Sequence, residues 1–417
     1  MLNRHMANTL KYTEKLGMDR KRILIVAATD LSDDNSASLC HSAYIRGFVQ
    51  SGHDVRVLTV SPLSHRHKHE VDGVEYIYIS DENFLVRNIR ERRKNISIVS
   101  QKQNNVVETE VQSLKQQIKK VVKEVAVCLF GATTTWNKRA CKFKSDEKLD
   151  LVLSLSSPPT SHSVAYKLLK RRRIKSIEWC QLWEDPWSTD LYKVDPTVYK
   201  KEKRLLDKAS KVLYVTPMTL ERQRKLFASN AEKMDWLPLP TYFSESISLG
   251  EENGFTFGYF GQYFPQVRNL APVYNALNRM KQKFIICGEP RDLFQETLTT
   301  EIYPRVTPDE LKKFEDQTNV LVFVANLGGG QIPGKIYQYS GTDKWILFVL
   351  DGTEQEKCVL KEYFGKFNRY AFCDNTEESI MENVTKILNG TLHDVTNKKV
   401  DYFEAGNIAN EILLRVL

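Results

Sequence analysis

The feature that most constrains the fold is a glycine-rich junction between two apolar segments. Residues 320–325 and 345–350 are apolar throughout and predict two buried strands. Between them, glycines 328–330 lead into Pro333, Gly334 and Lys335, where a helical pattern starts. Proline suits a first helical position, and the free N–H groups of a helix start favour an anion. The order strand, glycine loop, helix, strand therefore predicts a phosphorylated ligand at the carboxyl end of a parallel sheet.

The same glycines have a second interpretation. A tight turn between a strand and a helix requires glycine for its geometry alone, and isolated glycine motifs are weak signals. The segment is not a P-loop, because Lys335 is followed by isoleucine and not by serine or threonine. It also does not follow a first strand as a dinucleotide fingerprint does. Other segments must decide between a ligand loop and a plain turn.

Strand and helix patterns alternate along most of the chain, and this alternation favours parallel sheets. In the first half, strands are predicted at 22–28, 54–60, 74–79, 151–155, 177–182 and 211–215. In the second half, they are predicted at 256–261, 284–287, near 302, 320–325 and 345–350, with helices near 269–281 and 308–315. A chain of 417 residues is too long for one core. We expect α/β domains at 1–245 and 251–400, with a helix at 401–417 that packs back on the first domain.

The segment 85–148 differs from its surroundings by its charge. Residues 87–148 hold fifteen Lys and Arg against six Asp and Glu, whereas the whole chain has a formal charge of +8. Apolar residues between 111 and 129 recur at helical spacing beside lysines, which predicts a basic amphipathic helix. It is a solvated insertion, a nucleic-acid contact or a membrane-docking segment. Aromatic residues for base stacking are scarce, so we favour an anionic membrane surface over nucleic acid.

The remaining composition fits a protein of the cytoplasm. No stretch approaches the ~20 apolar residues that span a bilayer, and the first residues lack the apolar core of a signal peptide. The seven cysteines are scattered without a Cys-x-x-Cys pair, which fits reduced thiols and gives no zinc signature.

Three short segments then carry a resemblance to a known family. They are 156–162 (SSPPTSH), 183–187 (WEDPW) and 332–339 (IPGKIYQY), supported by 259–261 and 287–288. In this order, the chain resembles the GT-B glycosyltransferases, and among them the retaining enzymes of family 4. The resemblance implies two Rossmann-like doubly wound domains that face a cleft. It implies a nucleotide-sugar donor on the second domain, a saccharide acceptor on the first, and no metal or other cofactor.

The resemblance also implies roles for single residues. Lys335 and Arg268 match the cations that balance the donor diphosphate, and His162 matches a residue that orients the donor sugar, so these three are the expected catalytic residues. The expected donor-binding residues are Gly261, Gln262, Gly288, Pro333, Gly334, Lys335 and Gln338. The expected acceptor-binding residues are Trp183, Asp185 and Trp187. From the residues alone, the alternative for His162 is a solvated histidine at a helix start, and the alternative for the two tryptophans is a place in the core.

Several positions depart from the family pattern. Two glutamates that members commonly carry eight positions apart correspond to Gly330 and Gln338, and a Gly-Arg pair corresponds to Gly261 and Gln262. We therefore hold two hypotheses. The first is a glycosyltransferase that extends a lipid-linked saccharide in cell-surface polysaccharide assembly, at the inner face of the plasma membrane. The alternative is a non-catalytic GT-B-like subunit that binds a saccharide or a partner enzyme. A nucleotide-sugar epimerase of the same fold is less favoured, because it gives the basic segment no role.

Overall fold

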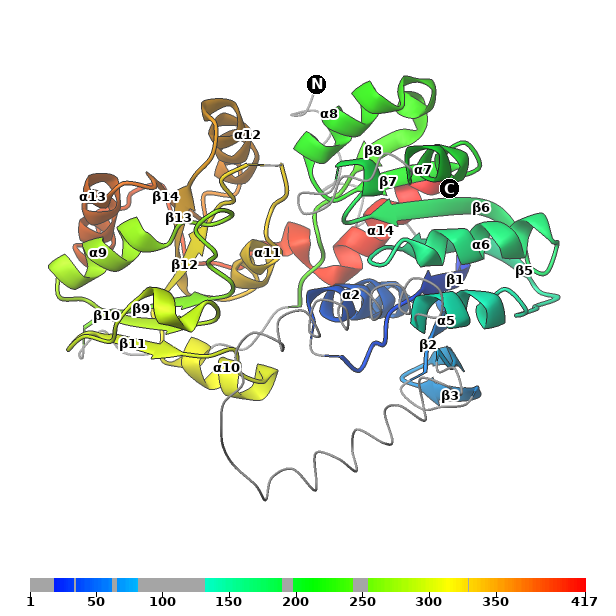
Figure 1. Cartoon of the computed structure of the whole chain (residues 1–417), viewed down its shortest axis with the longest axis horizontal. Helices are drawn as coiled ribbons and strands as arrows, with labels where there is room; N and C mark the ends of the chain where they lie inside the picture. Colours follow the sequence, from blue (N-terminus) through cyan, green and yellow to red (C-terminus); the bar gives the residue numbers. More distant parts are fainter. Residues whose placement is uncertain are drawn as a thin grey trace, which may run out of the picture.

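The computed structural model describes residues 19–33, 35–61, 66–81, 132–189, 198–242, 254–328 and 330–417. These residues form two domains side by side, each built on a parallel or mainly parallel sheet with helices on both faces (Figure 1). The α/β fold class with two doubly wound domains is thus confirmed.

The sheet of the first domain has the order β3-β4-β2-β1-β5-β6-β7-β8. Only β3 runs antiparallel to its neighbour, in a hairpin with β4 that the sequence did not predict. The strands are β1 (Arg22–Ala27), β2 (Asp54–Val60), β3 (His67–Val71), β4 (Val74–Ile79), β5 (Lys148–Leu155), β6 (Lys175–Trp183), β7 (Lys211–Tyr214) and β8 (Met234–Trp236).

Helices cover both faces of this sheet. Leu24 and Val26 of β1 point into the core under one face, whereas Ile23 and Ile25 point into the core under the other. Burial on both faces explains why the strands are continuous apolar runs. The helices are α2 (Ser36–Gln50), α5 (Ala132–Ala140), α6 (Thr160–Lys170), α7 (Tyr199–Leu206) and α8 (Pro217–Leu226).

The second sheet is parallel throughout and has the order β11-β10-β9-β12-β13-β14. Its strands are β9 (Thr256–Phe260), β10 (Lys283–Cys287), β11 (Thr300–Tyr303), β12 (Val320–Val324), β13 (Trp345–Leu350) and β14 (Ala371–Asp374). Its helices are α9 (Ala271–Arg279), α10 (Pro308–Asp316), α11 (Lys335–Ser340), α12 (Glu354–Gly365) and α13 (Glu377–Leu388). Helices α9 and α13 pack on one face, and α11 and α12 on the other.

The chain returns to the first domain at its end. Thr241, on the outward crossing, pairs with Glu404 on the return crossing in a parallel bridge. Helix α14 (Ala405–Val416) then packs against α2, and its Ile408 and Ile412 enter the core of the first domain. The two crossings therefore lie side by side where the domains meet.

The predicted boundary of the basic insertion is wrong at its C-terminal end. Residues 82–131, which hold the predicted amphipathic helix, lie outside the described residues. Residues 132–148 belong to the first domain, because α5 packs on the sheet and β5 starts at Lys148. Trp136 of α5 is fully buried, and its Nε1 donates a hydrogen bond to the carbonyl of Thr59 at 3.1 Å. Phe143 is buried in the same core.

Candidate functional site

Both sheets have a switch point at which the strand order reverses, and ligands of α/β proteins bind at such points. In the first sheet it lies between β1 and β5, and in the second between β9 and β12. Thr29 follows β1, and Ser156 and Ser157 follow β5. Gly261 and Asn326 follow β9 and β12. The side-chain hydrogen bond from Gln331 of the second domain to Asp185 of the first shows that these strand ends face each other across the junction.

A polar network connects the strand ends of the first domain. Thr29 Oγ1 donates to the carbonyl of Ser157 at 2.8 Å, and Ser157 Oγ donates to Asp185 Oδ2 at 3.0 Å. Asp185 comes just after β6, and therefore lies at the same sheet edge as Thr29 and Ser157. The structure thus places Asp185, a predicted acceptor-binding residue, at the switch point of the first sheet.

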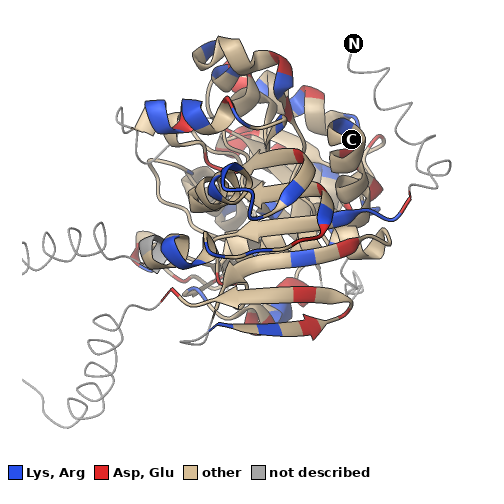
Figure 2. Ribbon diagram, turned by 90° about the vertical axis from the view of Figure 1, so that its right-hand side faces the viewer, with Lys and Arg blue, Asp and Glu red and all other residues tan. Residues whose placement is uncertain are grey.

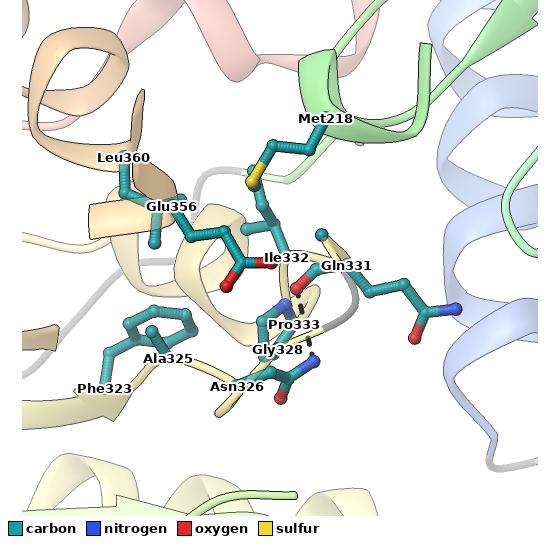
Figure 3. A pocket seen from close by; sticks show the side chains of 11 residues that line it. Met218, Phe323, Ala325, Asn326, Gly328, Gln331, Ile332, Pro333, Glu356 and Leu360 are labelled. Atoms are coloured by element: carbon teal, nitrogen blue, oxygen red, sulfur yellow. Dashed lines mark hydrogen bonds between the residues drawn. The ribbon is translucent and has the colours of Figure 1, made fainter. Parts of the chain in front are cut away.

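The network continues into the second domain. Gln331 Nε2 donates to Asp185 Oδ1 at 2.8 Å. The Gln331 carbonyl accepts from Asn326 Nδ2 at 3.2 Å, as Figure 3 shows. Arg268 Nε donates to Asn326 Oδ1 at 3.0 Å. A continuous hydrogen-bonded chain therefore links Arg268 to Asp185. Sequence reasoning missed Gln331 and Asn326, although both flank the glycine run and Asn326 follows the end of a predicted strand.

A second group of polar side chains lies beneath the strand ends and was also missed. His41 of α2 is fully buried, and its Nε2 donates to the Ser156 carbonyl at 3.0 Å and lies 3.3 Å from Glu184 Oε1. The Glu184 amide in turn donates to Ser156 Oγ at 3.0 Å. Because a carbonyl oxygen only accepts hydrogen bonds, Nε2 is the His41 ring nitrogen that carries a proton. His41 and Glu184 therefore hold together two loops, the one after β5 that carries Ser157 and the one after β6 that carries Asp185.

His162 lies behind this loop and not on its surface. It is fully buried, its Nδ1 lies 2.8 Å from Ser154 Oγ, and its ring centroid is 4.2 Å from that of Trp183. Burial, with a smaller contribution from nearby His41, lowers the pKa of His162 to about 3. The imidazole is therefore neutral near pH 7. Its Nε2 has no hydrogen-bond partner among the described residues.

The two predicted acceptor tryptophans lie against the core of the first domain. Trp183 is fully buried, and its Nε1 donates to Gln181 Oε1 at 2.9 Å. Trp187, in a short 3-10 helix (Trp187–Thr189), is half-buried and packs edge-to-face on Trp183 at 5.7 Å. Both faces of the Trp183 ring are enclosed, so Trp183 has the core role that the residues alone had left open.

A cavity of ≈ 270 Å³ opens between the domains beside Lys335 and Gln338. Its walls also include Glu315 and Lys312 of α10, residues of α2, and the crossing segment at Thr241. Lys335 Nζ lies 3.5 Å from Glu315 Oε1 and 5.9 Å from the centroid of the Tyr339 ring, and 31% of its side chain is exposed. The cavity thus offers an ammonium group and a primary amide to a ligand.

Arg268 and its neighbours form a separate part of the site. Arg268 Nη1 and the hydroxyl of Tyr259 both donate to the Gln262 carbonyl, at 2.8 and 2.7 Å. A Cβ at Gly288 would collide with the Gly261 carbonyl, so the loops after β9 and β10 touch only because position 288 is glycine. Arg268 does not line the cavity that holds Lys335. The two predicted cations therefore lie on neighbouring strand ends and do not share one pocket.

The glycine loop contacts the first domain, which its sequence did not reveal. Gly330 has φ +72°, its carbonyl accepts from Thr216 Oγ1 at 2.7 Å, and a Cβ there would lie 2.8 Å from Met218 Cβ. Next to it, Arg222 of α8 lies 3.2 Å from Glu356 of α12. Glu356 lines a small hollow beneath this loop (Figure 3). Glycine at 330 is therefore required for the contact between domains.

The start of the following helix also differs from the prediction. Helix α11 starts at Lys335 with Gly334 as its N-cap, so Pro333 precedes the helix and does not occupy its first position. It has only six residues, and the amides of Ile336 and Tyr337 donate to the carbonyls of Pro333 and Gly334. Lys335 and Gln338, and not a long helix N-terminus, are therefore the polar groups that this segment offers to the cavity.

The described part of the chain offers no clustered metal ligands. Within these residues, no three His, Cys, Asp or Glu side chains are grouped so that they could hold a metal ion. The described helices include none with the length and apolar character needed to cross a bilayer.

Known structures share this two-domain arrangement. The catalytic domain of starch synthase IV from Arabidopsis thaliana, bound to ADP and acarbose, has a TM-score of 0.62 at 9% identity, covering 95% of this chain and 99% of that one. HepE from Anabaena, in complex with UDP and glucose, has a TM-score of 0.57 at 11% identity, with 95% and 99% covered. Sucrose-phosphate synthase from Thermosynechococcus elongatus has a TM-score of 0.54 at 11% identity, with 95% of each chain covered.

No model of a known protein family matches the sequence, and no curated protein matches it. At identities of 9–11%, the structural similarity establishes the fold alone. It extends over both sheets and nearly the whole length of each chain, so the chain has the two-domain GT-B fold of these proteins.

Proposed function

We propose that the chain is a glycosyltransferase that moves a sugar from a nucleotide-sugar donor to a saccharide acceptor. The observation that supports this most is the meeting of the two switch points. There, hydrogen bonds through Asn326 and Gln331 connect Arg268 of the second domain to the Asp185 carboxylate of the first. The cavity beside Lys335 opens between the same two domains. Donor and acceptor chemistry need such groups on opposite sides of one cleft.

The donor would lie on the second domain. The Lys335–Glu315 separation of 3.5 Å is loose for an ion pair, so a phosphate group can compete for the ammonium. The Gln338 amide both donates and accepts, which suits a ribose hydroxyl. Arg268 lies on the neighbouring strand end, where its guanidinium can approach a second phosphate oxygen. Gly261, Gln262 and Gly288 bring backbone groups to the same edge.

The chemistry would rest on charge stabilisation. As the bond to the sugar breaks, negative charge grows on the leaving diphosphate, and the Lys335 ammonium and the Arg268 guanidinium would stabilise it. These cations would do so without a metal ion. Asp185 would accept a hydrogen bond from the acceptor hydroxyl. The neutral His162 would pack on Trp183 and so support the loop after β6 that carries Asp185. Retention of the anomeric configuration is proposed from the resemblance to family 4.

We further propose that the acceptor is lipid-linked and serves cell-surface polysaccharide assembly. The support is the charge of residues 85–148, since each basic side chain near an anionic surface contributes about 1 kcal/mol. Flotation with anionic vesicles tests this directly. Replacing Lys115, Lys119, Lys120 and Lys123 with Gln should release the protein, and failure of the wild type to float at low salt would rule the membrane role out.

A non-catalytic saccharide- or partner-binding subunit is the second candidate. It is favoured by the Asp185 contacts, because Ser157 and Gln331 already bond both carboxylate oxygens. It is also favoured by glycine at position 330, where only backbone atoms can face a ligand.

A thermal-shift screen followed by a transfer assay separates the two candidates. UDP, GDP, ADP, CMP and dTDP are tested first, and one nucleoside diphosphate should raise the melting temperature because a ligand that binds only the folded state stabilises it. The matching nucleotide sugar should then be consumed with an acceptor, also in the presence of EDTA. Stabilisation without turnover favours the subunit, and loss of turnover in EDTA contradicts the metal-free mechanism.

A further inference from the structure

A second hollow lies on the first domain, at the sheet edge opposite the cleft. It has a volume of ≈ 450 Å³ and is formed by the second half of α6, the first residues of β6 and the turn before β7. Strands β5, β6 and β7 are parallel, so their amino ends lie at this edge of the sheet. In Figure 2 this side of the first domain faces the viewer. Glu184 and Asp185 follow the carboxyl end of β6. The hollow is therefore separate from the site between the domains.

The wall of this hollow is aromatic and apolar. Tyr166 and Trp179 stack with ring centroids 6.3 Å apart and an angle of 18° between their planes. Ile177 stands beside them with 53% of its surface exposed, although it belongs to a strand. A partly exposed aromatic and aliphatic wall suits the C–H face of a sugar ring.

The rim of the hollow is basic. Lys170, at the end of α6, and Lys208, in the turn before β7, both line it, and Lys170 Nζ lies 5.7 Å from the centroid of the Tyr166 ring. In the described part of the chain, neither lysine has a carboxylate within ion-pair distance. Lys170 also begins the turn 170–175, in which five of six residues are Lys or Arg. Glu178 is the acidic residue among those that line the hollow.

We propose that this hollow binds an anionic sugar unit, a pyranose that bears a carboxylate or a phosphate, within a saccharide chain. The ring packs against Tyr166 and Ile177, and the anionic group lies between Lys170 and Lys208. Glu178, the acidic residue of the lining, disfavours a second negative charge beside it. This binding does not depend on sugar transfer in the cleft.

Isothermal titration of the full chain tests the proposal. The probe is a hyaluronan hexasaccharide, which alternates glucuronate with N-acetylglucosamine, and maltohexaose is the neutral comparison. The double variant Lys170→Gln/Lys208→Gln removes both rim cations. The double variant Lys281→Gln/Lys283→Gln removes two exposed lysines of the second domain and is the matched control. The wild type should bind the anionic chain more tightly than the neutral one, and more weakly at high salt.

The rim variant should bind the anionic hexasaccharide about tenfold more weakly or worse, since two charge-assisted contacts are lost. The control variant should bind it like the wild type. A cleft variant, Lys335→Ala, should leave this binding unchanged, which separates the hollow from the proposed transfer site. Equal binding of maltohexaose, no binding of either saccharide, or full binding by the rim variant would overturn the proposal. Flotation with phosphatidylglycerol vesicles gives one more test. If the wild type and the control variant float and only the rim variant does not, the proposal is overturned, because the hollow would then bind lipid.

Discussion

The side-chain amide of Gln331 donates to Asp185 Oδ1 at 2.8 Å and joins the two domains, although the residues are 146 positions apart. Asp185 also accepts from Ser157 Oγ within the first domain. A ligand that needs the Asp185 carboxylate must therefore replace or share the Gln331 contact. This hydrogen bond couples the position of the glycine loop to the acceptor side of the cleft.

A double-mutant cycle measures that coupling. Asp185→Ala, Gln331→Ala and the double variant are unfolded with denaturant. A hydrogen bond to a charged group contributes ~1.5–3 kcal/mol, and partial exposure reduces this, so we expect a coupling free energy of about 1 kcal/mol. The pair Gln331→Ala and Asp235→Ala, whose side chains share no hydrogen bond in the described residues, is the control. Additive effects for Asp185 and Gln331 would show that the contact is absent in solution.

Gly330 gives a sharper test of how the domains meet. Alanine at φ +72° costs about 1–3 kcal/mol, and its Cβ would also lie 2.8 Å from Met218 Cβ. Gly330→Ala should therefore lower the melting temperature by several degrees. Gly328→Ala is the matched control, because a Cβ there has no heavy atom within 4 Å, and it should change stability by about 0.5 kcal/mol or less. Equal effects of the two substitutions would mean that Gly330 does not contact α8.

The strands could be predicted well because both faces of the sheets are buried. Residues 345–350 were predicted as a strand and form β13 with the same limits. No strand or helix was predicted at the end of the second domain. Its strand β14 has only four residues, which alternate between buried and half-buried and so give no apolar run. Helix α12 buries only Leu360, Tyr363 and Phe364 of its twelve residues, which leaves a weak helical pattern.

The candidate site was predicted only where a residue follows a strand or a motif. Asp185, Lys335 and Gln338 lie at the meeting of the domains for this reason. His41 has no local signal, because its partners Ser156 and Glu184 are distant in sequence. Gln331 and Asn326 lie beside the glycine run, but the contact of Gln331 with the distant Asp185 is not visible in the sequence. The glycine run was ambiguous for a physical reason: a ligand loop and a close domain contact both require residues without side chains. Met218, which decides the case at Gly330, lies in the other domain.

The buried His162 predicts a dependence of stability on pH. Its pKa is lowered to about 3 in the folded state, whereas a histidine in the unfolded chain has a pKa of about 6.5. Below pH 6.5 only the unfolded state binds this proton, so stability is lost as the pH falls toward 3. The loss from this residue should be about 1.4 kcal/mol per pH unit.

Denaturant unfolding of His162→Leu between pH 7 and pH 4.5 checks this. Ser154 keeps contacts with Trp179 Nε1 and the Cys180 carbonyl, so the substitution leaves no hydroxyl without a partner. The variant should lose the slope that His162 supplies. His69→Gln, at an exposed position on β3, should keep the wild-type slope. An unchanged slope in His162→Leu would mean that this imidazole already titrates normally in the folded protein.

Lys335 tests the donor side of the proposed function. Lys335→Ala should weaken binding of the preferred nucleoside diphosphate roughly ten- to hundredfold, because a charge-assisted contact contributes ~1.5–3 kcal/mol. The corresponding nucleoside, which has no phosphate, should bind almost as it does to the wild type. Lys312→Ala is the matched control, since Lys312 lines the same cavity but forms an ion pair with Asp316 on its own helix. Titration calorimetry with both ligands separates the outcomes. If Lys335→Ala weakens the nucleoside and the diphosphate equally, the ammonium does not contact phosphate, and Lys335 only shapes the cavity.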